Sequence, residues 1–237
     1  MIEIKEVSKK YDSQIVVNNL SLKVSKGEVL GFLGPNGAGK TTTMKMITGF
    51  INPNAGDILV NNYSVLKNPL EVKKSIGYLP EGAPHYGEMK TGDFLKFISK
   101  IRNISKEKTN DAINYVIEAL SLETMLEKRI EHLSKGFKRR VGLAQAIIHN
   151  PNILILDEPT DGLDPNQKHE VRNLIKKISK DKTIIISTHI LEEVGAVCSN
   201  ASIIANGNLV YHDSAVNLKK LGKGSYDEVF RKLTTEQ

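Results

Sequence analysis

The sequence predicts an α/β protein whose core is a mainly parallel β-sheet covered by helices. Short apolar strands alternate with helices near both ends of the chain, as in folds that contain a parallel sheet. Residues 2–24 include stretches that alternate apolar and polar side chains, which predicts an N-terminal antiparallel β subdomain. Helical periodicity over 87–149 predicts an inserted helical subdomain. We therefore expect 1–237 to be a single domain in which 1–86 and 150–237 form the core.

The first third of the chain is expected to be rich in strands. The segments IEIKEV and LSLKV alternate in polarity, whereas EVLGFLG is apolar almost throughout, which is typical of a buried strand. A helix is expected directly after the glycine-rich sequence that follows this buried strand. The predicted elements are strands at 2–7, 20–24 and 28–34, a helix at 39–48, and strands at 56–62 and 75–80.

The rest of the chain is expected to pass from helices back to alternating strands and helices. Apolar residues recur at helical spacing from Val141 onward, and Asn150-Pro151 ends that helix. Asn206-Gly207 is typical of a hairpin turn. The predicted elements are helices at 91–101, 108–122 and about 134–149, strands at 153–156 and 183–187, helices at 165–179 and from 190, a hairpin at 201–213 and a short amphipathic helix at 225–234.

The composition is that of an ordinary globular protein, with 40% hydrophobic and 25% charged residues among 237. A formal net charge of +6 favours anionic partners without naming one. Cys198 is the only cysteine, so an internal disulfide is excluded. The N-terminal segment has no apolar run of the signal-peptide kind, and no apolar run approaches the roughly 20 residues of a membrane-spanning helix. We therefore expect neither a signal peptide nor a transmembrane segment.

The sequence GPNGAGKTT is a phosphate-binding loop, or P-loop, in the strand–loop–helix context that the motif requires. Its glycines allow backbone N–H groups to surround phosphates, Lys40 is expected at the β- and γ-phosphates, and Thr41 is expected to hold Mg²⁺. A glycine-rich turn without a ligand is the alternative, and the context argues against it. The predicted nucleotide-binding residues of this loop are Gly34, Pro35, Asn36, Gly37, Ala38, Gly39, Lys40, Thr41 and Thr42.

Two further strands end in residues that suit phosphate chemistry. The apolar strand ILIL delivers Asp157 to its carboxyl end, where a carboxylate can hold Mg²⁺, and Glu158 follows, placed to polarise an attacking water. The strand TIIIS leads to His189 in the same topological position, so His189 is expected to face the same crevice and orient Glu158. Each signal is weak alone and becomes strong behind a P-loop. The predicted catalytic residues are Lys40, Glu158 and His189.

The segment HLSKGFKRR places a polar cap and a basic cluster at the start of a helix. Ser134 and Gly136 occupy the first turn, together with four cations, Lys135, Lys138, Arg139 and Arg140. Cations at a helix N-terminus oppose the helix dipole, whereas an anion is favoured there. We therefore interpret this segment as a second site for a strongly anionic ligand.

These motifs, in this order and over almost the whole chain, resemble the ATP-binding subunit of ABC transporters. The resemblance identifies GPNGAGKTT as Walker A, ILILDE as Walker B, DGLD at 161–164 as the D-loop and LSKGF as the signature motif. It implies that ATP binds between Walker A of one chain and Ser134 and Gly136 of a second chain in a head-to-tail homodimer. It also places Tyr11, with Val16 as a second contact, against the adenine ring.

The sequence departs from the family pattern at three positions. Lys135 and Phe137 replace the Gly and Gln of the usual signature, and Glu81 stands where the family usually has the Gln of its Q-loop. A carboxylate is a hard oxygen ligand, so we expect Glu81 to join Thr41 and Asp157 at Mg²⁺. These departures, the long segment after the Q-loop and the ending SYDEVFRKLT resemble the exporter branch of the family.

The resemblance implies an ATPase subunit that powers a separate multi-helix permease, with export as the expected direction. It implies a cytoplasmic protein, peripheral on the cytoplasmic face of the inner or plasma membrane, with ATP and Mg²⁺ as cofactors and no nucleic acid partner. The alternatives are a soluble ABC ATPase that acts on nucleic acid or ribosomes, which the basic cluster suggests, and an ATPase that serves protein-complex assembly.

Overall fold

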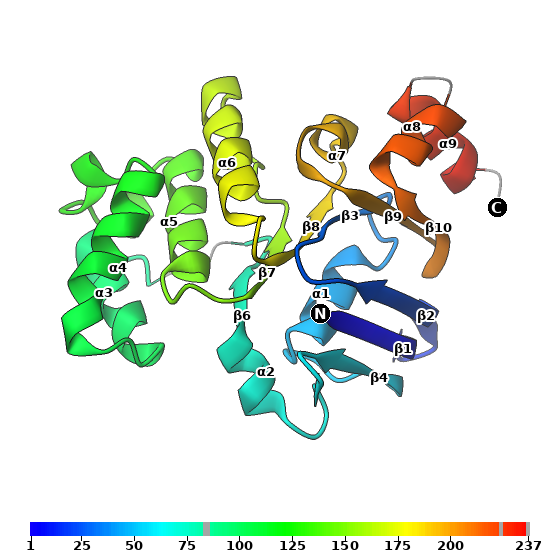
Figure 1. Cartoon of the computed structure of the whole chain (residues 1–237), viewed down its shortest axis with the longest axis horizontal. Coiled ribbons are helices and arrows are strands. Elements are labelled where there is room, and N and C mark those ends of the chain that lie inside the picture. The colour runs from blue at the N-terminus through cyan, green and yellow to red at the C-terminus, as the bar shows by residue number, and fades with distance from the viewer. Residues whose placement is uncertain (83–85, 223–224, 236–237) are drawn as a thin grey trace.

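The computed structural model describes residues 1–82, 86–222 and 225–235, and within them two β-sheets organise the chain (Figure 1). The smaller sheet is antiparallel and has the strand order β2-β1-β4-β5. Its elements are β1 (Ile2–Tyr11), β2 (Gln14–Val24), β4 (Ala55–Val60) and β5 (Tyr63–Ser64). This sheet is the predicted antiparallel part of the fold.

The larger sheet is mainly parallel and has the strand order β10-β9-β3-β8-β7-β6. Its neighbours are parallel from β9 to β6, and only the edge strand β10 runs antiparallel, to β9. The elements are β3 (Val29–Leu33), β6 (Ile76–Leu79), β7 (Ile153–Asp157), β8 (Thr183–Thr188), β9 (Asn200–Ala205) and β10 (Asn208–Ser214). The predicted fold class is therefore confirmed.

Strands β3, β7 and β8 are buried along their whole lengths, because helices cover one face of the parallel sheet and α1 with the antiparallel sheet covers the other. Figure 1 shows α3, α4 and α5 together at one end of the molecule, and α8 and α9 at the other. The helices are α1 (Lys40–Ile47), α2 (Pro69–Ser75), α3 (Thr91–Ile101), α4 (Lys106–Ala119), α5 (Lys135–Ile147), α6 (Pro165–Ile178), α7 (Leu191–Val197), α8 (Ala215–Leu221) and α9 (Tyr226–Thr235), with 3₁₀ turns at Glu123–Met125 and Ile130–His132.

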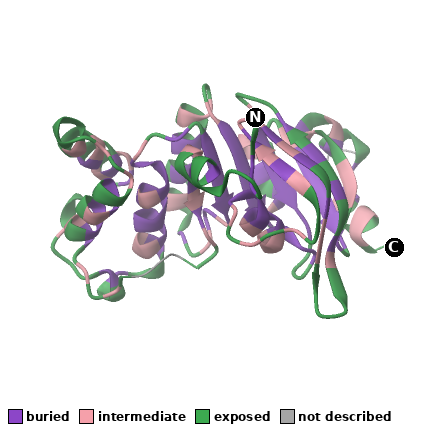
Figure 2. Cartoon of the chain, turned by 90° about the horizontal axis from the view of Figure 1, so that it is seen from below, coloured by how far each residue is buried: buried purple, intermediate pink, exposed green. Residues whose placement is uncertain are grey.

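The hydrophobic core is divided by the parallel sheet. One cluster joins Leu154 and Leu156 of β7 to α3, α4, α5 and α6, whereas a second joins Ile153 and Ile155 of the same strand to α1 and the antiparallel sheet. This alternation follows from the two-residue repeat of a strand. Figure 2 shows the buried residues where strands and helices face one another, with exposed residues on the outer faces and loops. Helix α1 is thus held between the two sheets.

The predicted elements are present, and the structure adds or extends several others. Strands β1 and β2 are longer than expected because they continue pairing as far as Tyr11 and Gln14, through register shifts that break the simple alternation. Strand β5 and helices α2 and α8 were not predicted, because they are short and bury few side chains. The exporter-like segment after the Q-loop includes 83–85, which lie outside the described residues.

The helices at 91–101, 106–119 and 135–147 fall within the predicted insertion, but the subdomain boundaries at 86/87 and 149/150 stay a prediction. No helix in the described part of the chain combines the length and the apolar character needed to cross a membrane.

Candidate functional site

The P-loop connects β3 to α1 and needs glycine at two positions. Gly39 has a left-handed backbone with φ of 105°, and a Cβ atom there would lie 2.6 Å from the carbonyl oxygen of Val16. A Cβ atom on Gly34 would collide with the backbone of Ile204. The chain around the loop therefore passes too close for any other residue, which keeps the backbone N–H groups at the start of α1 accessible.

Lys40 is folded back over this loop. Its ammonium donates hydrogen bonds to the carbonyl oxygens of Gly34, at 2.7 Å, and Pro35, at 3.0 Å. The side chain is buried, and burial lowers the pKa of Lys40, while the nearby carboxylates of Glu158 and Asp157 oppose that shift. The cation is therefore held at the P-loop by groups that phosphate oxygens can replace.

A pocket of about 240 Å³ opens beside the P-loop. It brings together residues from four separate parts of the sequence, which the prediction expected to meet. Lys40 supplies positive charge to its wall, while Glu81 and Glu158 supply negative charge. The residues that line it are Val16, Asn36, Gly37, Gly39, Lys40, Thr41, Thr42, Glu81 and Glu158.

Asp157 ends β7, directly before the pocket residue Glu158. It is 1% exposed, and burial raises the pKa of its carboxyl group, opposed first by the hydrogen bond from Ser187. Ser187 donates its hydroxyl to Oδ1 of Asp157, while the buried Oδ2 has no hydrogen-bond partner within the described residues. The Thr41 hydroxyl donates to Glu81 at 3.4 Å. These oxygens form the donor set that a hard divalent cation prefers.

The described residues contain no preformed cluster of three His, Cys, Asp or Glu side chains that could hold a metal by itself. Thr41, Glu81 and Asp157 therefore fit a cation whose remaining ligands are phosphate oxygens or water, as is usual for Mg²⁺.

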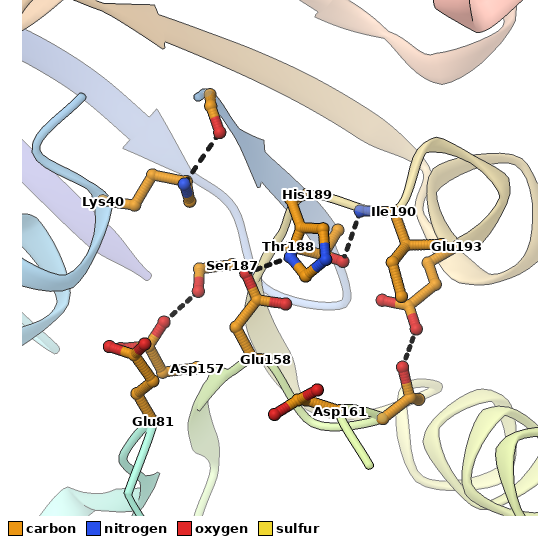
Figure 3. A network of polar contacts seen from close by, with 12 residues as sticks. Lys40, Glu81, Asp157, Glu158, Asp161, Ser187, Thr188, His189, Ile190 and Glu193 are labelled. Atoms are coloured by element: carbon orange, nitrogen blue, oxygen red, sulfur yellow. Dashed lines mark hydrogen bonds and ion pairs between the residues drawn. The ribbon is translucent and has the colours of Figure 1, made fainter. Parts of the chain in front are cut away.

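Glu158 lies one residue beyond β7 in a left-handed backbone conformation, with φ of 52°. Its amide donates to the Ser187 carbonyl oxygen at 3.0 Å, and its own carbonyl oxygen accepts from the Asp161 amide at 3.1 Å. The Nδ1 atom of His189 lies 2.9 Å from Oε1 of Glu158 (Figure 3). The expected contact between these two residues is present, and an unusual backbone conformation of this kind is typical of functional sites.

Behind this pair lies a buried carboxylate that sequence reasoning missed. Glu193, in the first turn of α7, is 1% exposed and accepts a hydrogen bond from the Thr160 hydroxyl (Figure 3). Burial raises the pKa of Glu193, opposed by a hydrogen bond from Thr188 and by the charge of Arg172. Glu193 thus joins the loop after Glu158 to the strand end before His189. Nothing in the sequence distinguishes Glu193 from the preceding Glu192, which is the same residue type and is exposed.

The interpretation of the basic cluster is wrong for Arg139 and Arg140. Both are 5% exposed: Arg139 donates to backbone carbonyl oxygens of the core, and Arg140 donates to the Leu120 carbonyl oxygen and pairs with Glu170 at 2.9 Å. Lys135 is exposed but pairs with Asp161 at 2.8 Å. Helical geometry turns the fifth and sixth residues of α5, Arg139 and Arg140, inward, where they satisfy polar groups of this chain instead of an outside anion.

Several predicted binding residues do not line the pocket. Ser134 is the N-cap of α5 and accepts a hydrogen bond from the Phe137 amide at 3.4 Å. Gly136 is packed against Gln167 and Leu163, and a Cβ atom there would lie 2.6 Å from Oε1 of Gln167. Tyr11 is exposed at the end of β1, with the Lys9 ammonium 5.4 Å from its ring centre. Of the predicted adenine contacts, only Val16 lines the pocket.

Comparison with known proteins adds independent evidence. A family model described as ABC transporter matches residues 17–161. The chain is 36% identical to an uncharacterized ABC transporter ATP-binding protein of Bacillus subtilis, over 93% of this chain and 73% of the relative. It is 38% identical to the bacitracin transport ATP-binding protein of Bacillus licheniformis, over 93% of this chain and 72% of the relative. A solved structure of an ATP binding subunit of an ABC transporter superposes with a TM-score of 0.91 and 29% identity, covering 98% of this chain and 99% of that one.

The buried carboxyl of Glu193 predicts a pH-dependent stability. A raised pKa in the folded state means that the carboxyl stabilises the fold below its unfolded-state pKa, and that this contribution is lost as the pH rises through the folded-state pKa. Glu193→Gln keeps an acceptor for Thr160 and has no proton to lose. We therefore expect the stability of Glu193→Gln relative to wild type to increase between pH 5 and pH 8, measured as the free energy of urea unfolding. Glu192→Gln, an exposed neighbour, is the control, and parallel pH curves for all three proteins would contradict the prediction.

Proposed function

The chain belongs to the ABC transporter family as one of its ATPases, and from this premise we propose that two copies bind MgATP head to tail and power export through a separate permease. The observation that carries the proposal is the pocket in which the P-loop faces Glu81 and Glu158, with His189 in contact with Glu158. The family establishes ATP binding and an ATPase. The residue roles, metal, dimer and partner below are our proposals.

Nucleotide binding is assigned to the P-loop residues from Gly34 to Thr42. The first residues of α1 line the pocket, and the N-terminus of a helix suits the negative charge of phosphates. Lys40 would exchange its two loop carbonyl contacts for β- and γ-phosphate oxygens, which are stronger acceptors. Val16 lines the pocket and would contact the adenine, with Tyr11 stacking only if the end of β1 moves toward it.

Mg²⁺ is assigned to Thr41, Asp157 and Glu81. The unpaired buried Oδ2 of Asp157 and the Thr41–Glu81 contact at 3.4 Å support this assignment. When bound, Mg²⁺ would neutralise phosphate charge. It would also offset the repulsion between a triphosphate and the carboxylates of Glu81 and Glu158, which face the same pocket as Lys40.

For hydrolysis, Glu158 is assigned as the base. Its carboxylate would accept a hydrogen bond from the attacking water and take its proton as the water oxygen bonds to the γ-phosphorus and the bond to the β-phosphate oxygen breaks. With Glu158 ionised, Nδ1 of His189 carries the proton in their 2.9 Å contact, because a carboxylate can only accept. His189 would thereby orient Glu158, while Lys40 stabilises the charge on the transferred group.

Ser134 and Gly136 are assigned to the ATP of a second copy. They lie at the N-terminus of the 13-residue helix α5, and neither lines the pocket of their own chain. A helix N-terminus suits a phosphate, so the two residues can serve a nucleotide only if another chain presents it. ATP would then bridge two chains, and its hydrolysis would release them.

The permease and the location at the cytoplasmic face of the membrane are supported by relatives. One relative is named a bacitracin transport ATP-binding protein. Another, from Burkholderia orbicola and 34% identical to this chain, is named a Nod factor export ATP-binding protein I. The alternative of a nucleic acid partner loses its main support, because Arg139 and Arg140 of the basic cluster are buried. No structural observation favours the assembly alternative.

Glu158→Gln should lower ATP turnover by about 10²- to 10⁴-fold, because it removes the base but keeps the size and an acceptor of the side chain. Light scattering after size exclusion should then show a monomer without ATP and a dimer with it. A second change in this background, Ser134→Asp, keeps an N-cap acceptor but puts negative charge against the partner's phosphate. The double variant should bind ATP and stay monomeric; a dimer in both proteins would rule out the assignment of Ser134.

Glu81→Gln tests the metal assignment. Loss of the carboxylate should raise the Mg²⁺ concentration needed for half-maximal ATP turnover and for ATP binding by roughly 10-fold, the scale of losing one supporting group at a metal site. Glu131→Gln, which lies outside the pocket, is the control. Unchanged Mg²⁺ dependence and turnover would remove Glu81 from the metal site.

The permease is tested by purifying the tagged full chain from its own cells in mild detergent. We expect a multi-helix membrane protein to accompany it. Recovery with RNA, or with a soluble complex and no membrane protein, would instead support one of the two alternatives.

A further inference from the structure

We propose that Arg139 is a positioning residue that ties helix α5 to both acidic walls of the nucleotide pocket, so that ATP turnover depends on it and nucleotide binding does not. The inference rests on the roles proposed above for Glu81 and Glu158. Arg139 is one of two buried arginines near the start of α5.

The guanidinium of Arg139 binds the backbone of two separate loops. Its Nη1 donates to the carbonyl oxygens of Pro80, at 2.7 Å, and Glu81, at 3.0 Å, where the chain leaves β6. Its Nη2 donates to the carbonyl oxygens of Glu158, at 2.6 Å, and Asp157, where the chain leaves β7. One side chain therefore holds the backbone of both acidic residues that face the P-loop.

The chemistry of this contact requires arginine. A guanidinium is a planar fork that can donate to several acceptors in fixed directions, whereas a lysine ammonium is a flexible point charge. Burial lowers the pKa of Arg139, opposed by the charges of nearby acidic groups, first Asp157 and then Asp161, Glu158 and Glu81. Within the described residues Arg139 forms no direct ion pair with a carboxylate, and its guanidinium donates to carbonyl oxygens instead.

The backbone that Arg139 holds determines where the reactive carboxylates point. Glu158 adopts φ of 52°, and its carbonyl oxygen is bound by Arg139 while its amide is bound by the Ser187 carbonyl oxygen. Glu81 reaches Thr41 from a loop whose two carbonyl oxygens are bound by the same guanidinium. A displacement of α5 would therefore move both carboxylates relative to the P-loop.

Helix α5 connects the residues proposed to bind the partner's ATP with the residues that act on the ATP of its own chain. Ser134, proposed to meet the partner's ATP, caps the helix that carries Arg139 five residues later. Helix α5 is rigid on this scale, because its residues are joined by backbone hydrogen bonds. Docking of the α5 N-terminus on a second chain would thus shift the loops that carry Glu81 and Glu158 of its own chain.

Arg140 provides a matched control. It is the next residue of the same helix, has the same 5% exposure, and donates to the Leu120 carbonyl oxygen and to Glu170. None of these residues lines the nucleotide pocket. A conservative change at Arg140 therefore disturbs α5 to a similar extent without touching the loops that carry Glu81 and Glu158.

The experiment compares Arg139→Lys, Arg139→Gln and Arg140→Lys in the full chain. It measures the kcat of ATP hydrolysis, the Kd of a fluorescent ATP analogue, thermal unfolding and backbone amide hydrogen exchange. We expect both Arg139 variants to lose kcat by roughly 10- to 100-fold, the scale of a small misplacement of reacting groups. Their nucleotide Kd should stay within about threefold of wild type, a small free-energy change. The amides of residues 81–82, 157–158 and 160–161 should exchange faster in the Arg139 variants. Their exchange should be unchanged in Arg140→Lys, which should also keep its kcat.

Three results would overturn the proposal: an unchanged kcat in the Arg139 variants, a loss of nucleotide binding as large as the loss of kcat, or an equal loss of kcat in Arg140→Lys. Failure of both Arg139 variants to fold would make the residue structural and overturn it as well. Glu158→Gln is measured in parallel. Full turnover in that variant would reject the proposed base, whereas the exchange rates of the amides in 81–82, 157–158 and 160–161 test Arg139 independently of that assignment.

Discussion

The structure depends on one constraint of parallel sheets, which is that the carboxyl ends of neighbouring strands meet at the same edge. Strand β3 leads into the P-loop, β7 ends at Asp157, β8 ends at Thr188 and β6 leads to Glu81. The registers of the sheet pair Asp157 with Ser187 and Leu33 with Thr188, which brings these ends level. The loops after β3, β6 and β7 therefore line one pocket beside α1, and His189, in the loop after β8, contacts Glu158 at its wall.

The meeting of strand ends would not by itself hold the loops that follow them in place. Buried polar side chains restrain these loops. Arg139 binds the two loops that carry Glu81 and Glu158, and Glu193, in the helix after β8, accepts a hydrogen bond from Thr160 in the loop after Glu158. Burying a charge is costly unless it is satisfied by hydrogen bonds or counter-charges. Arg139 and Glu193 are both buried in spite of this cost, next to loops whose carboxylates must be well positioned for phosphoryl transfer.

Prediction succeeded where local sequence and tertiary burial agree. The predicted helix at 91–101 coincides with α3, because its apolar face is the one that joins the core. Prediction failed for α2 and α8, which are seven residues each and too short to show a periodic pattern. It also failed for the ends of β1 and β2, where pairing between the strands continues through polar residues that alternate poorly.

By itself, the sequence determined the fold class, the P-loop and the strand ends that carry Asp157, Glu158 and His189, because each depends on a local pattern of apolar, glycine and acidic residues. Only the tertiary structure decided which cations face solvent. Four cations near the start of α5 look alike in the sequence, yet Lys135 pairs with Asp161 at the surface and Arg139 is buried against four carbonyl oxygens. The direction of a side chain depends on what the rest of the chain packs against its helix, and a linear pattern does not contain that information.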